Sequence, residues 1–301
     1  MRVAAIYDIH ANLPALEAVL QEIRQAEVDQ VIVGGDVVPG PLPKETLRCL
    51  LDLPVPTQFI YGNGEVAVLE QMAGRDPSAV PEQHRPIIRW TARQLPEYEP
   101  LFAAWPKTIR IEIPPLGGVL FCHGTPRDEN EIFTGLTAED RLLPIFEALN
   151  APVIVCGHSH MQFDRMVGNT RVVNAGSVGM PFGEPGADWL LLGPGVQLRH
   201  TSYDLTTAAE RVTYSSRRRR TPCSKPLPTP NGDPRDERIF VARPLACSVG
   251  FPAGVPCRDF RKTRGLFFRS GGDLVAGSFG CGHAALPNDR RPRRATLAME
   301  P

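Results

Sequence analysis

The 301-residue sequence lacks the features that mark several large classes of protein. Its formal net charge at pH 7 is zero, and no apolar run approaches the roughly 20 residues that a membrane-spanning helix needs. The first 20 residues do not resemble a signal peptide, because Asp8, His10 and Asn12 interrupt the apolar run too early. We therefore expect neither a transmembrane helix nor a secretory leader.

Cysteine is also scarce. Residues 1–215 contain only Cys49, Cys122 and Cys156, which are far apart in the sequence and lie among apolar residues. This spacing predicts reduced thiols in a cytoplasmic protein rather than a framework of disulfides. The four later cysteines show no C-x-x-C spacing, which argues against a zinc module in that part of the chain.

The balance of charge differs between two parts of the chain. Residues 1–215 contain 16 Lys and Arg against 26 Asp and Glu, whereas residues 216–301 contain 17 against 7. An acidic body does not favour nucleic acid as the main partner. The run RRRR at 217–220 could bind phosphates of a nucleic acid, but a solvated tail is the simpler interpretation.

Residues 216–301 also differ in composition. They contain 11 prolines and nine glycines, and no tyrosine follows Tyr214. Such a segment cannot easily bury a core, so we predict that it is disordered. Because the change begins abruptly inside the predicted helix that starts at "YDLTTAAERV", a shift of reading frame in a GC-rich gene is a second explanation. The predicted folded domain is therefore 1–215.

Strand and helix patterns alternate at the start of the chain. Short apolar runs at 2–7, 30–35 and 57–62 alternate with helical patterns at 13–23 and 43–53, and Asn12 stands at the expected N-cap of the first helix. This alternation predicts a parallel α/β core. Residues 65–105 are helical in pattern but rich in proline, so we interpret them as an insertion or cap.

The rest of the folded domain is mostly strands. They suggest a β-sandwich partly flanked by helices, with one helix at about 137–149. The predicted strands are 108–114, 118–124, 152–158, 161–167, 170–176, 187–193 and 196–203.

Polar side chains follow five of the predicted strands at the point where each strand ends. Each one alone has an ordinary explanation, such as a turn residue or a core histidine. Ligands of open α/β sheets gather beyond the carboxyl ends of the strands, so these donors are expected to converge. The pairs two residues apart would point to the same side if the chain there is extended. The seven residues are Asp8, His10, Asp36, Asn63, His123, His158 and His160.

The order of these residues resembles a known signature. The pattern D-x-H, G-D, G-N, H-G and G-H-x-H is similar to that of the calcineurin-like metallophosphoesterases, most closely the compact bacterial and archaeal branch. The resemblance extends from Asp8 to about Tyr203, and "NAGSVGMP" at 174–181 resembles a loop of that branch. It implies a four-layer α/β/β/α sandwich with two metal ions in a groove at the ends of the sheets.

The resemblance also implies a role for each residue. Asp8, His10 and His160 would hold the first ion, Asn63, His123 and His158 the second, and Asp36 would bridge both. Imidazole and carboxylate ligands suit Mn²⁺, Fe²⁺, Co²⁺, Ni²⁺ or Zn²⁺. The implied activity is that of a hydrolase, a phosphatase or phosphodiesterase, in which a metal-bridging hydroxide attacks phosphorus. Asp36, His123 and Asn63 are the expected catalytic residues, and the substrate is a small phosphoester or a phosphoprotein.

The sequence departs from the family pattern at Gly64. Many members have a histidine there that protonates the leaving oxygen, and losing a general acid costs ~10²–10⁴ in rate. Either another group supplies the proton or the substrate has a good leaving group. Glu65 and His84 are the candidate proton donors, with a solvated helix-start glutamate and a surface histidine as the alternatives. Arg127 is a candidate for contacting a phosphate oxygen, with an exposed turn arginine as the alternative.

Two other functions are compatible with the pattern. A retromer subunit resembles this family and serves mainly as an interaction scaffold, but substituted ligands would mark that route and all seven are present here. Repair nucleases share the motifs, but those proteins have longer chains and keep the histidine after the asparagine, whereas this chain has Gly64 there. We therefore favour the enzyme.

Overall fold

The computed structural model describes residues 1–218, 264–268 and 274–278. The chain divides into two units, Met1–Val255 and Pro256–Pro301. In the second unit, the strands β11 (Arg264–Phe268) and β12 (Leu274–Ser278) form an antiparallel pair. The prediction of a disordered or frame-shifted tail at 216–301 falls largely outside the described residues, so it stays a prediction.

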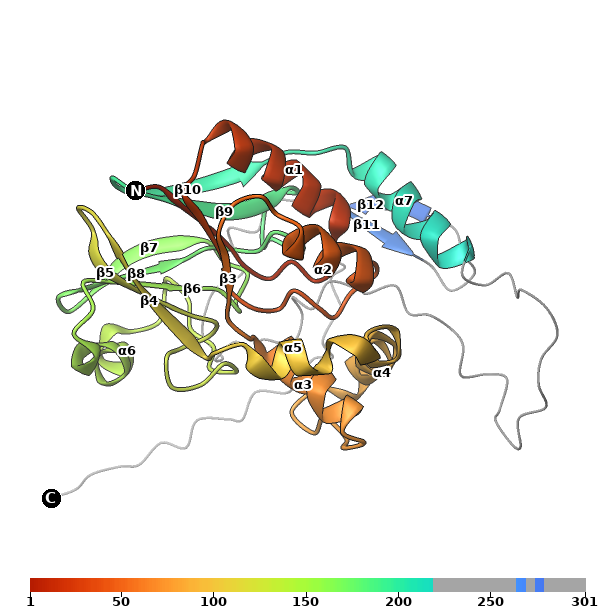
Figure 1. Ribbon diagram of the computed structural model, residues 1–301, viewed down its shortest axis with the longest axis horizontal. Coiled ribbons are helices and arrows are strands. Elements are labelled where there is room, and N and C mark those ends of the chain that lie inside the picture. Colours follow the sequence, from red (N-terminus) through yellow and green to blue (C-terminus); the bar gives the residue numbers. More distant parts are fainter. Residues whose placement is uncertain (219–263, 269–273, 279–301) are drawn as a thin grey trace, which may run out of the picture. The chain divides into compact units, whose positions relative to one another are not determined.

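The first sheet of unit 1 has the order β10-β9-β1-β2-β3 (Figure 1). Its central strands β1 (Val3–Ile6), β2 (Gln30–Val33) and β3 (Thr57–Phe59) are parallel. The strands β9 (Ala187–Leu192) and β10 (Val196–Thr201) extend the sheet in antiparallel fashion. The predicted parallel core is therefore confirmed, and the end of the folded domain returns to complete the sheet that its start begins.

The second sheet has the order β4-β5-β6-β8-β7. Its inner strands β5 (Gly117–Cys122), β6 (Val153–Cys156) and β8 (Thr170–Asn174) are parallel, and the edge strands β4 (Thr108–Ile113) and β7 (Phe163–Val167) are antiparallel to their neighbours. The predicted strands are present, each within a few residues of its expected bounds.

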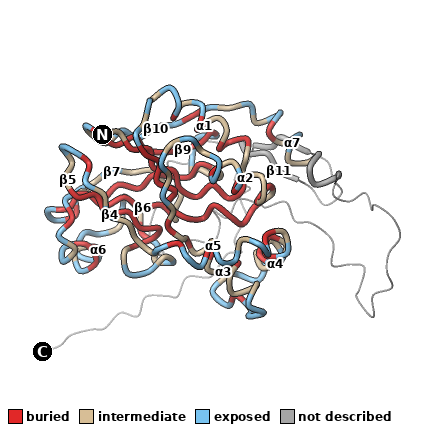
Figure 2. The backbone as a smooth tube through the Cα atoms, in the orientation of Figure 1, coloured by how far each residue is buried: buried red, intermediate tan, exposed pale blue. Residues whose placement is uncertain are grey.

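Side-chain alternation along the strands separates three buried clusters. Val3 and Ala5 of β1 pack between the sheets, against residues such as Phe121, whereas Ala4 and Ile6 face the helices on the other side. A third cluster joins the outer face of the second sheet to α6 (Glu139–Phe146). The central strands are buried, whereas the edge strands of both sheets carry intermediate and exposed residues (Figure 2). The predicted α/β/β/α order of layers is confirmed.

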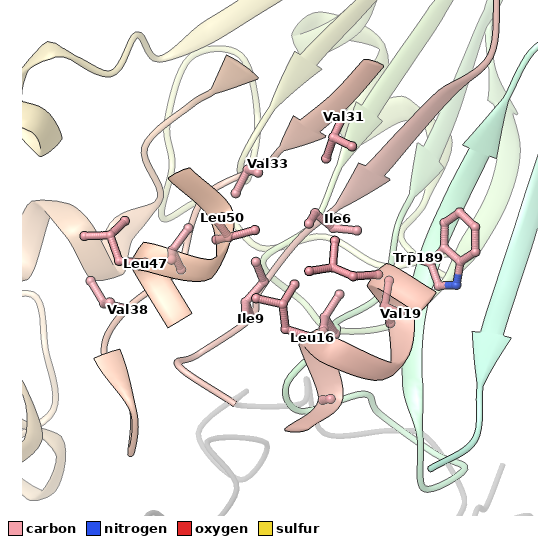
Figure 3. Close-up of a cluster of buried hydrophobic side chains, with 14 of the residues drawn as sticks. Ile6, Ile9, Leu16, Val19, Val31, Val33, Val38, Leu47, Leu50 and Trp189 are labelled. Carbon is pink, nitrogen blue, oxygen red and sulfur yellow. The ribbon is translucent and has the colours of Figure 1, made fainter. Parts of the chain in front are cut away.

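The helices α1 (Leu13–Gln25) and α2 (Pro43–Leu51) cover the first sheet. Figure 3 shows Leu16 and Val19 of α1 and Leu47 of α2 packed with Ile6 at the end of β1. Asn12 caps α1 as predicted, because its side-chain oxygen accepts a hydrogen bond from the backbone N–H of Ala15.

The proline-rich segment 65–105 is helical, as expected, and it packs into the main core. It contains most of α3 (Asn63–Met72) and all of η1 (Glu82–His84), α4 (Arg85–Gln94), η2 (Pro96–Tyr98) and α5 (Glu99–Ala104). Ile88 and Phe102 from this segment, with Trp105 at its end, belong to the same buried cluster as α1 and α2. The segment thus contributes to the fold as well as covering part of it.

The last described helix of unit 1 is α7 (Leu205–Arg218). Asp204 caps its N-terminus, because the Asp204 carboxylate accepts hydrogen bonds from the backbone N–H groups of Thr206 and Thr207. Arg211 pairs with Glu17 of α1, with Nη2 3.0 Å from Oε1. The predicted boundary after residue 215 lies inside this helix.

Two expectations from composition concern the described residues directly. None of the described helices combines the length and apolar character required to cross a bilayer. Cys49, Cys122 and Cys156 are all unpaired, with Cys122 and Cys156 buried and Cys49 half-buried.

Candidate metal centre

Loops at the carboxyl ends of five strands bring the seven predicted ligands to one place. Asp8 and His10 follow β1, Asp36 follows β2, and Asn63 is the first residue of α3, just beyond β3. From the second sheet, His123 follows β5 directly, and His158 and His160 follow β6. The parallel strands of each sheet end on the same edge, so these loops converge as the sequence predicts.

The local conformation differs from the one the sequence suggested. Asp8, His10, Asp36, His158 and His160 have left-handed backbone angles, with φ between 47° and 64°. The reasoning from alternation in extended chain was therefore wrong, because β1 ends at Ile6 and β6 ends at Cys156. Left-handed conformations are costly for residues with a Cβ and concentrate at functional sites. Five in one cluster indicate a site that the surrounding fold holds in place.

Backbone hydrogen bonds hold these strained loops against one another. The N–H of Asp8 donates to the Gly35 carbonyl at 3.1 Å, and the N–H of His10 donates to the Asp36 carbonyl at 2.9 Å. The Ser177 hydroxyl donates to the Asp8 carbonyl at 2.7 Å, and the Gly179 N–H donates to the same oxygen at 3.0 Å. The segment 174–181 therefore fixes the loop that carries Asp8.

The first group of donors consists of Asp8, His10 and His160. Asp8 Oδ1 lies 3.4 Å from His160 Nε2 and 3.8 Å from His10 Nε2, and these two nitrogens are 3.1 Å apart. His160 Nδ1 lies 2.8 Å from the Met180 carbonyl oxygen. A carbonyl only accepts, so Nδ1 carries the hydrogen and Nε2 of the neutral ring offers its lone pair to the cluster.

The second group consists of Asp8, Asp36 and His123. His123 Nε2 lies 3.5 Å from Asp36 Oδ1 and 3.8 Å from Asp8 Oδ1. Asn63 Oδ1 lies 3.0 Å from the same nitrogen. His123 Nδ1 lies 2.9 Å from the Gly34 carbonyl, so Nε2 is the nitrogen that faces the cluster. Both ring nitrogens lie beside oxygens that only accept, and although burial lowers the pKa of His123, Asp36 and Asp8 raise it above its usual value.

His158 lies beside the cluster in a different orientation. Its backbone N–H donates to Asp8 Oδ2 at 2.8 Å, and its ring centroid is 5.2 Å from that of His123. Its Nε2 lies 3.3 Å from the Asn130 carbonyl oxygen. This contact directs Nε2 away from the two groups, so Nδ1 is the nitrogen left to act as a ligand.

Burial and mutual charge perturb every titratable side chain of the centre. Burial acts to raise the pKa of Asp8, but His160, His123 and His10 outweigh it and hold that pKa well below its usual value. Burial lowers the pKa of His10 to about 3 and that of His158 to about 4. Burial raises the pKa of Asp36 to about 6, against the opposing effect of His123.

One atom indicates directly that a cation belongs here. Asp8 Oδ1 is buried and has no hydrogen-bond partner among the described residues. A buried carboxylate oxygen without a donor is costly, and the Nε2 atoms of three histidines lie within 3.8 Å of it. Two groups of oxygen and nitrogen donors that share this atom match the ligand preferences of divalent transition metals. The residues present therefore fit a pair of metal ions.

The residues around Asn63 explain the departure at Gly64. The Gly64 N–H donates to Asp36 Oδ1 at 2.6 Å. A Cβ at Gly64 would lie 2.4 Å from the Val38 carbonyl oxygen and 2.8 Å from Pro39 Cδ, so a side chain does not fit without moving that loop. The bare backbone at this position is part of the packing of the site.

The two candidate proton donors occupy different environments. Glu65 is fully buried, and both of its carboxylate oxygens accept hydrogen bonds from backbone N–H groups of the site loops. Burial and the neighbouring Asp36 raise its pKa to about 8, against the effect of those hydrogen bonds. The expected alternative of a solvated glutamate is therefore wrong. His84 is half-buried in η1, and in the described part of the chain no hydrogen bond links it to the cluster.

Arg127 lies in an exposed loop and is already paired. Its guanidinium donates to both carboxylate oxygens of Glu131, with Nε 2.8 Å from Oε2. Its carbonyl accepts a hydrogen bond from Lys107 at 2.8 Å. This environment matches the exposed turn arginine that the sequence left as the alternative to a phosphate contact.

Sequence reasoning missed the residues that position the ligands. Asn174 donates to the Gly157 carbonyl at 2.6 Å and to the Ser159 hydroxyl at 3.2 Å, which shapes the turn between β6 and His158. The Ser177 hydroxyl both donates to Asp8 and accepts the Met180 N–H at 2.8 Å. The segment "NAGSVGMP" contains both of these residues, so its resemblance to a loop of the family was the feature of the sequence that could have identified them.

Comparisons with known proteins agree with this geometry. The sequence model of the calcineurin-like phosphoesterase superfamily domain matches residues 1–192. A hypothetical protein from Pyrococcus horikoshii OT3 is similar in structure, with a TM-score of 0.63, 18% identity, and coverage of 71% of this chain and 93% of that chain. A metallophosphoesterase from Sphaerobacter thermophilus has a TM-score of 0.56 and 25% identity, with coverage of 72% and 94%. No curated protein matches the sequence.

Proposed function

The chain belongs to the calcineurin-like phosphoesterase superfamily, and on that premise we propose that it hydrolyses phosphomonoesters or phosphodiesters with two divalent metal ions. Asp8, His10 and His160 hold one ion in this proposal. Asn63, His123 and His158 hold the other, and Asp36 lies between them as the shared ligand. The substrate is a small phosphoester or a phosphoprotein.

The unpartnered Asp8 Oδ1 is the observation that carries the proposal. It lies within 3.8 Å of the Nε2 atoms of His10, His123 and His160, and it is fully buried. His123 and His160 each place Nδ1 against a backbone carbonyl, so Nε2 is the nitrogen that each directs toward this oxygen. A cation among these nitrogens would satisfy the buried carboxylate oxygen and would take the Nε2 lone pairs of the neutral rings as ligands.

The charge of the centre suits an anionic substrate. Two divalent ions would bring four positive charges, Asp8 and Asp36 supply two negative ones, and the histidines and Asn63 are neutral as ligands. The loaded site stays cationic and attracts a phosphoryl group. When bound, the ions would supply Lewis acidity for the phosphoryl oxygens and for a water molecule. Manganese, iron, cobalt, nickel and zinc all suit this ligand set.

The protein's own contribution is to fix the donors before the substrate arrives. The loops of Asp8 and Asp36 are joined backbone to backbone, and Ser177 holds the first of them. Such preorganisation supplies much of the catalysis in phosphoryl transfer, where positioning and charge stabilisation dominate. A role for Arg127 in phosphate binding would require its pair with Glu131 to open.

The packing at Gly64 bears on the substrate. No side chain fits after Asn63, and Glu65 is occupied by backbone donors, so neither supplies a proton directly to a leaving oxygen in this conformation. We infer a preference for substrates whose leaving group departs without protonation. Aryl esters should therefore react much faster than alkyl esters, by more than the ~10²–10⁴ that a general acid contributes for a poor leaving group.

The test is an activity assay on the full chain loaded with Mn²⁺. Hydrolysis of bis(p-nitrophenyl) phosphate and of p-nitrophenyl phosphate is followed by release of p-nitrophenolate, which needs no general acid. We expect turnover that depends on the metal and is lost in Asp36→Asn. The matched control is Asp164→Asn, the same change at a carboxylate of β7 paired with Arg171, which should leave the rate unchanged.

No turnover of either ester by a folded, metal-loaded protein would contradict the enzymatic proposal and would favour an interaction scaffold on the same fold. Equal rates for Asp36→Asn and the wild type would contradict the assignment of Asp36. The preferred ester distinguishes a phosphodiesterase from a phosphatase.

A further inference from the structure

We propose that Glu65 is a positioning residue that holds Asp36 and Asn63 together as one half of the metal centre. The proposal rests on the proposed function, because it assumes that these two residues bind metal. It assigns Glu65 a role other than proton donor, and it does not depend on how Glu65 titrates.

Glu65 makes three hydrogen bonds, all to backbone donors. Its Oε2 accepts from the N–H of Asp36 and from the N–H of Gly62, both at 2.8 Å, and its Oε1 accepts from the N–H of Val38 at 3.0 Å. The residue has no exposed surface. A carboxylate this far inside the protein is costly unless hydrogen bonds satisfy it, and here backbone groups of the site supply them.

These three bonds join two separate pieces of chain. Asp36 and Val38 belong to the loop after β2, and Gly62 is the residue before α3, whose first residue is Asn63. Asp36 has a left-handed φ of 50°, so its backbone needs an external constraint. Glu65 supplies that constraint at the N–H of Asp36 itself.

A second bond makes the arrangement reciprocal. Glu65 of α3 holds the backbone of Asp36, and the Gly64 N–H of the same helix turn holds the Asp36 side chain at 2.6 Å. Hydrogen bonds therefore fix both the backbone and the side chain of Asp36 to the first turn of α3, where Asn63 lies. Moving Glu65 would shift Asp36 and Asn63 relative to each other, and hence relative to His123.

The other half of the centre is held by different groups. His160 is fixed by the Met180 carbonyl, and the Asp8 carbonyl by the Ser177 hydroxyl, neither of which contacts Glu65. Asp36 is shared between the ions, but Asn63 belongs to one of them, so a change at Glu65 should weaken the ion held by Asn63 and His123 more than the ion held by His10 and His160. This selectivity separates a positioning role from a general effect on stability.

The experiment counts Mn²⁺ ions bound to the full chain by equilibrium dialysis. We expect two ions for the wild type. Glu65→Gln keeps the shape of the side chain but places an NH₂ group against a backbone N–H, so it loses at least one of the three bonds. We expect the ion at Asn63 to bind about 10–100-fold more weakly, the usual cost of losing a group that orients a ligand, and the other ion to be weakened less, through the shared Asp36 alone.

Double variants identify which ion is affected. In the background of Asn63→Ala, which weakens the same position, adding Glu65→Gln should act on the remaining ion only through the shared Asp36, and so should change binding less. In the background of His160→Ala, which weakens the opposite position, adding Glu65→Gln should remove the remaining tightly bound ion. Ser177→Ala is the matched comparison, because it also removes a buried positioning bond, and it should give the opposite pattern in the two backgrounds.

Far-UV circular dichroism shows whether each variant is folded, and Glu65→Asp replaces Glu65→Gln if that variant is not. Two ions bound with wild-type affinity by a folded Glu65 variant would overturn the positioning role while leaving the proposed function intact. Equal weakening of both ions, or the same loss in both backgrounds, would also overturn it. A wild type that binds no Mn²⁺ would overturn the proposed function and this role together.

Discussion

Replacing Asp8 with asparagine should remove most of the stabilisation that metal ions give to the protein, and should change the stability of the metal-free protein less. Asp8 contributes to both groups of donors, and its Oδ1 has no other partner among the described residues. Asparagine tolerates the left-handed φ of 51° at this position and can still accept the His158 N–H through its remaining oxygen. The histidines that lower the pKa of Asp8 also favour its charge without metal, so the free energy of unfolding of the metal-free protein should fall by about 1–3 kcal/mol.

With metal, the difference between the two proteins should be large. A ligand at 100 times its dissociation constant stabilises the folded state by about 2.7 kcal/mol, so two ions give about 5 kcal/mol. For a domain of this size each kcal/mol corresponds to roughly 2–4 °C in Tm, so the wild type should gain roughly 10–20 °C. Asp8→Asn should gain only a small fraction of this shift.

The assay is differential scanning calorimetry of both proteins after chelation and again in excess Mn²⁺. Asp164→Asn is the control, since it removes a carboxylate that pairs with Arg171 on the second sheet, and it should gain as much as the wild type. If Asp8→Asn is stabilised by Mn²⁺ to the same extent as the wild type, the reasoning from the unpartnered oxygen is refuted.

Three further changes test other parts of the account. Gly62→Ala would place a methyl group 2.2 Å from Asp36 Oδ1, so it should cost about 1–3 kcal/mol of stability and most of the activity, while Gly195→Ala, with open space around its Cβ, should do neither. Leu47 of α2 is fully buried, so Leu47→Ala should lower the free energy of unfolding by about 2–5 kcal/mol in urea titrations. Burial raises the pKa of the Cys122 thiol far above its usual value, so its reactive thiolate is absent at pH 8, and iodoacetamide should label it only after unfolding, as mapped by mass spectrometry.

The layers of the fold were predictable because periodicity reports burial. Fully apolar runs such as Val3–Ile6 indicate strands covered on both faces, and the alternation with helical patterns indicates parallel pairing. The antiparallel return of β9 beside β1 was not predictable, because nothing local to Ala187–Leu192 specifies which sheet it joins. Such pairing is set by long-range packing between the sheets.

For the site, the sequence indicated which residues converge but not how the chain presents them. Asp8, His10 and Asp36 were expected at strand ends, and the structure places them there, but Asp8 and His10 adopt left-handed turns rather than the extended chain that their spacing suggested. The loop of Asp8 is held by Gly35, whose carbonyl accepts the Asp8 N–H, and by Ser177, whose hydroxyl donates to the Asp8 carbonyl, and both residues are far from Asp8 in the sequence. The role of Glu65 was missed for the same reason, since its partners are backbone groups that no side-chain pattern reveals.

The most direct test of the central claim is a crystal structure of the full chain loaded with Mn²⁺, with anomalous scattering used to locate the ions. The account predicts two anomalous peaks, one beside Asp8, His10 and His160 and the other beside Asn63 and His123, with Asp36 contacting both. A single peak, or peaks only at exposed carboxylates away from Asp8, would contradict a dinuclear centre in this chain.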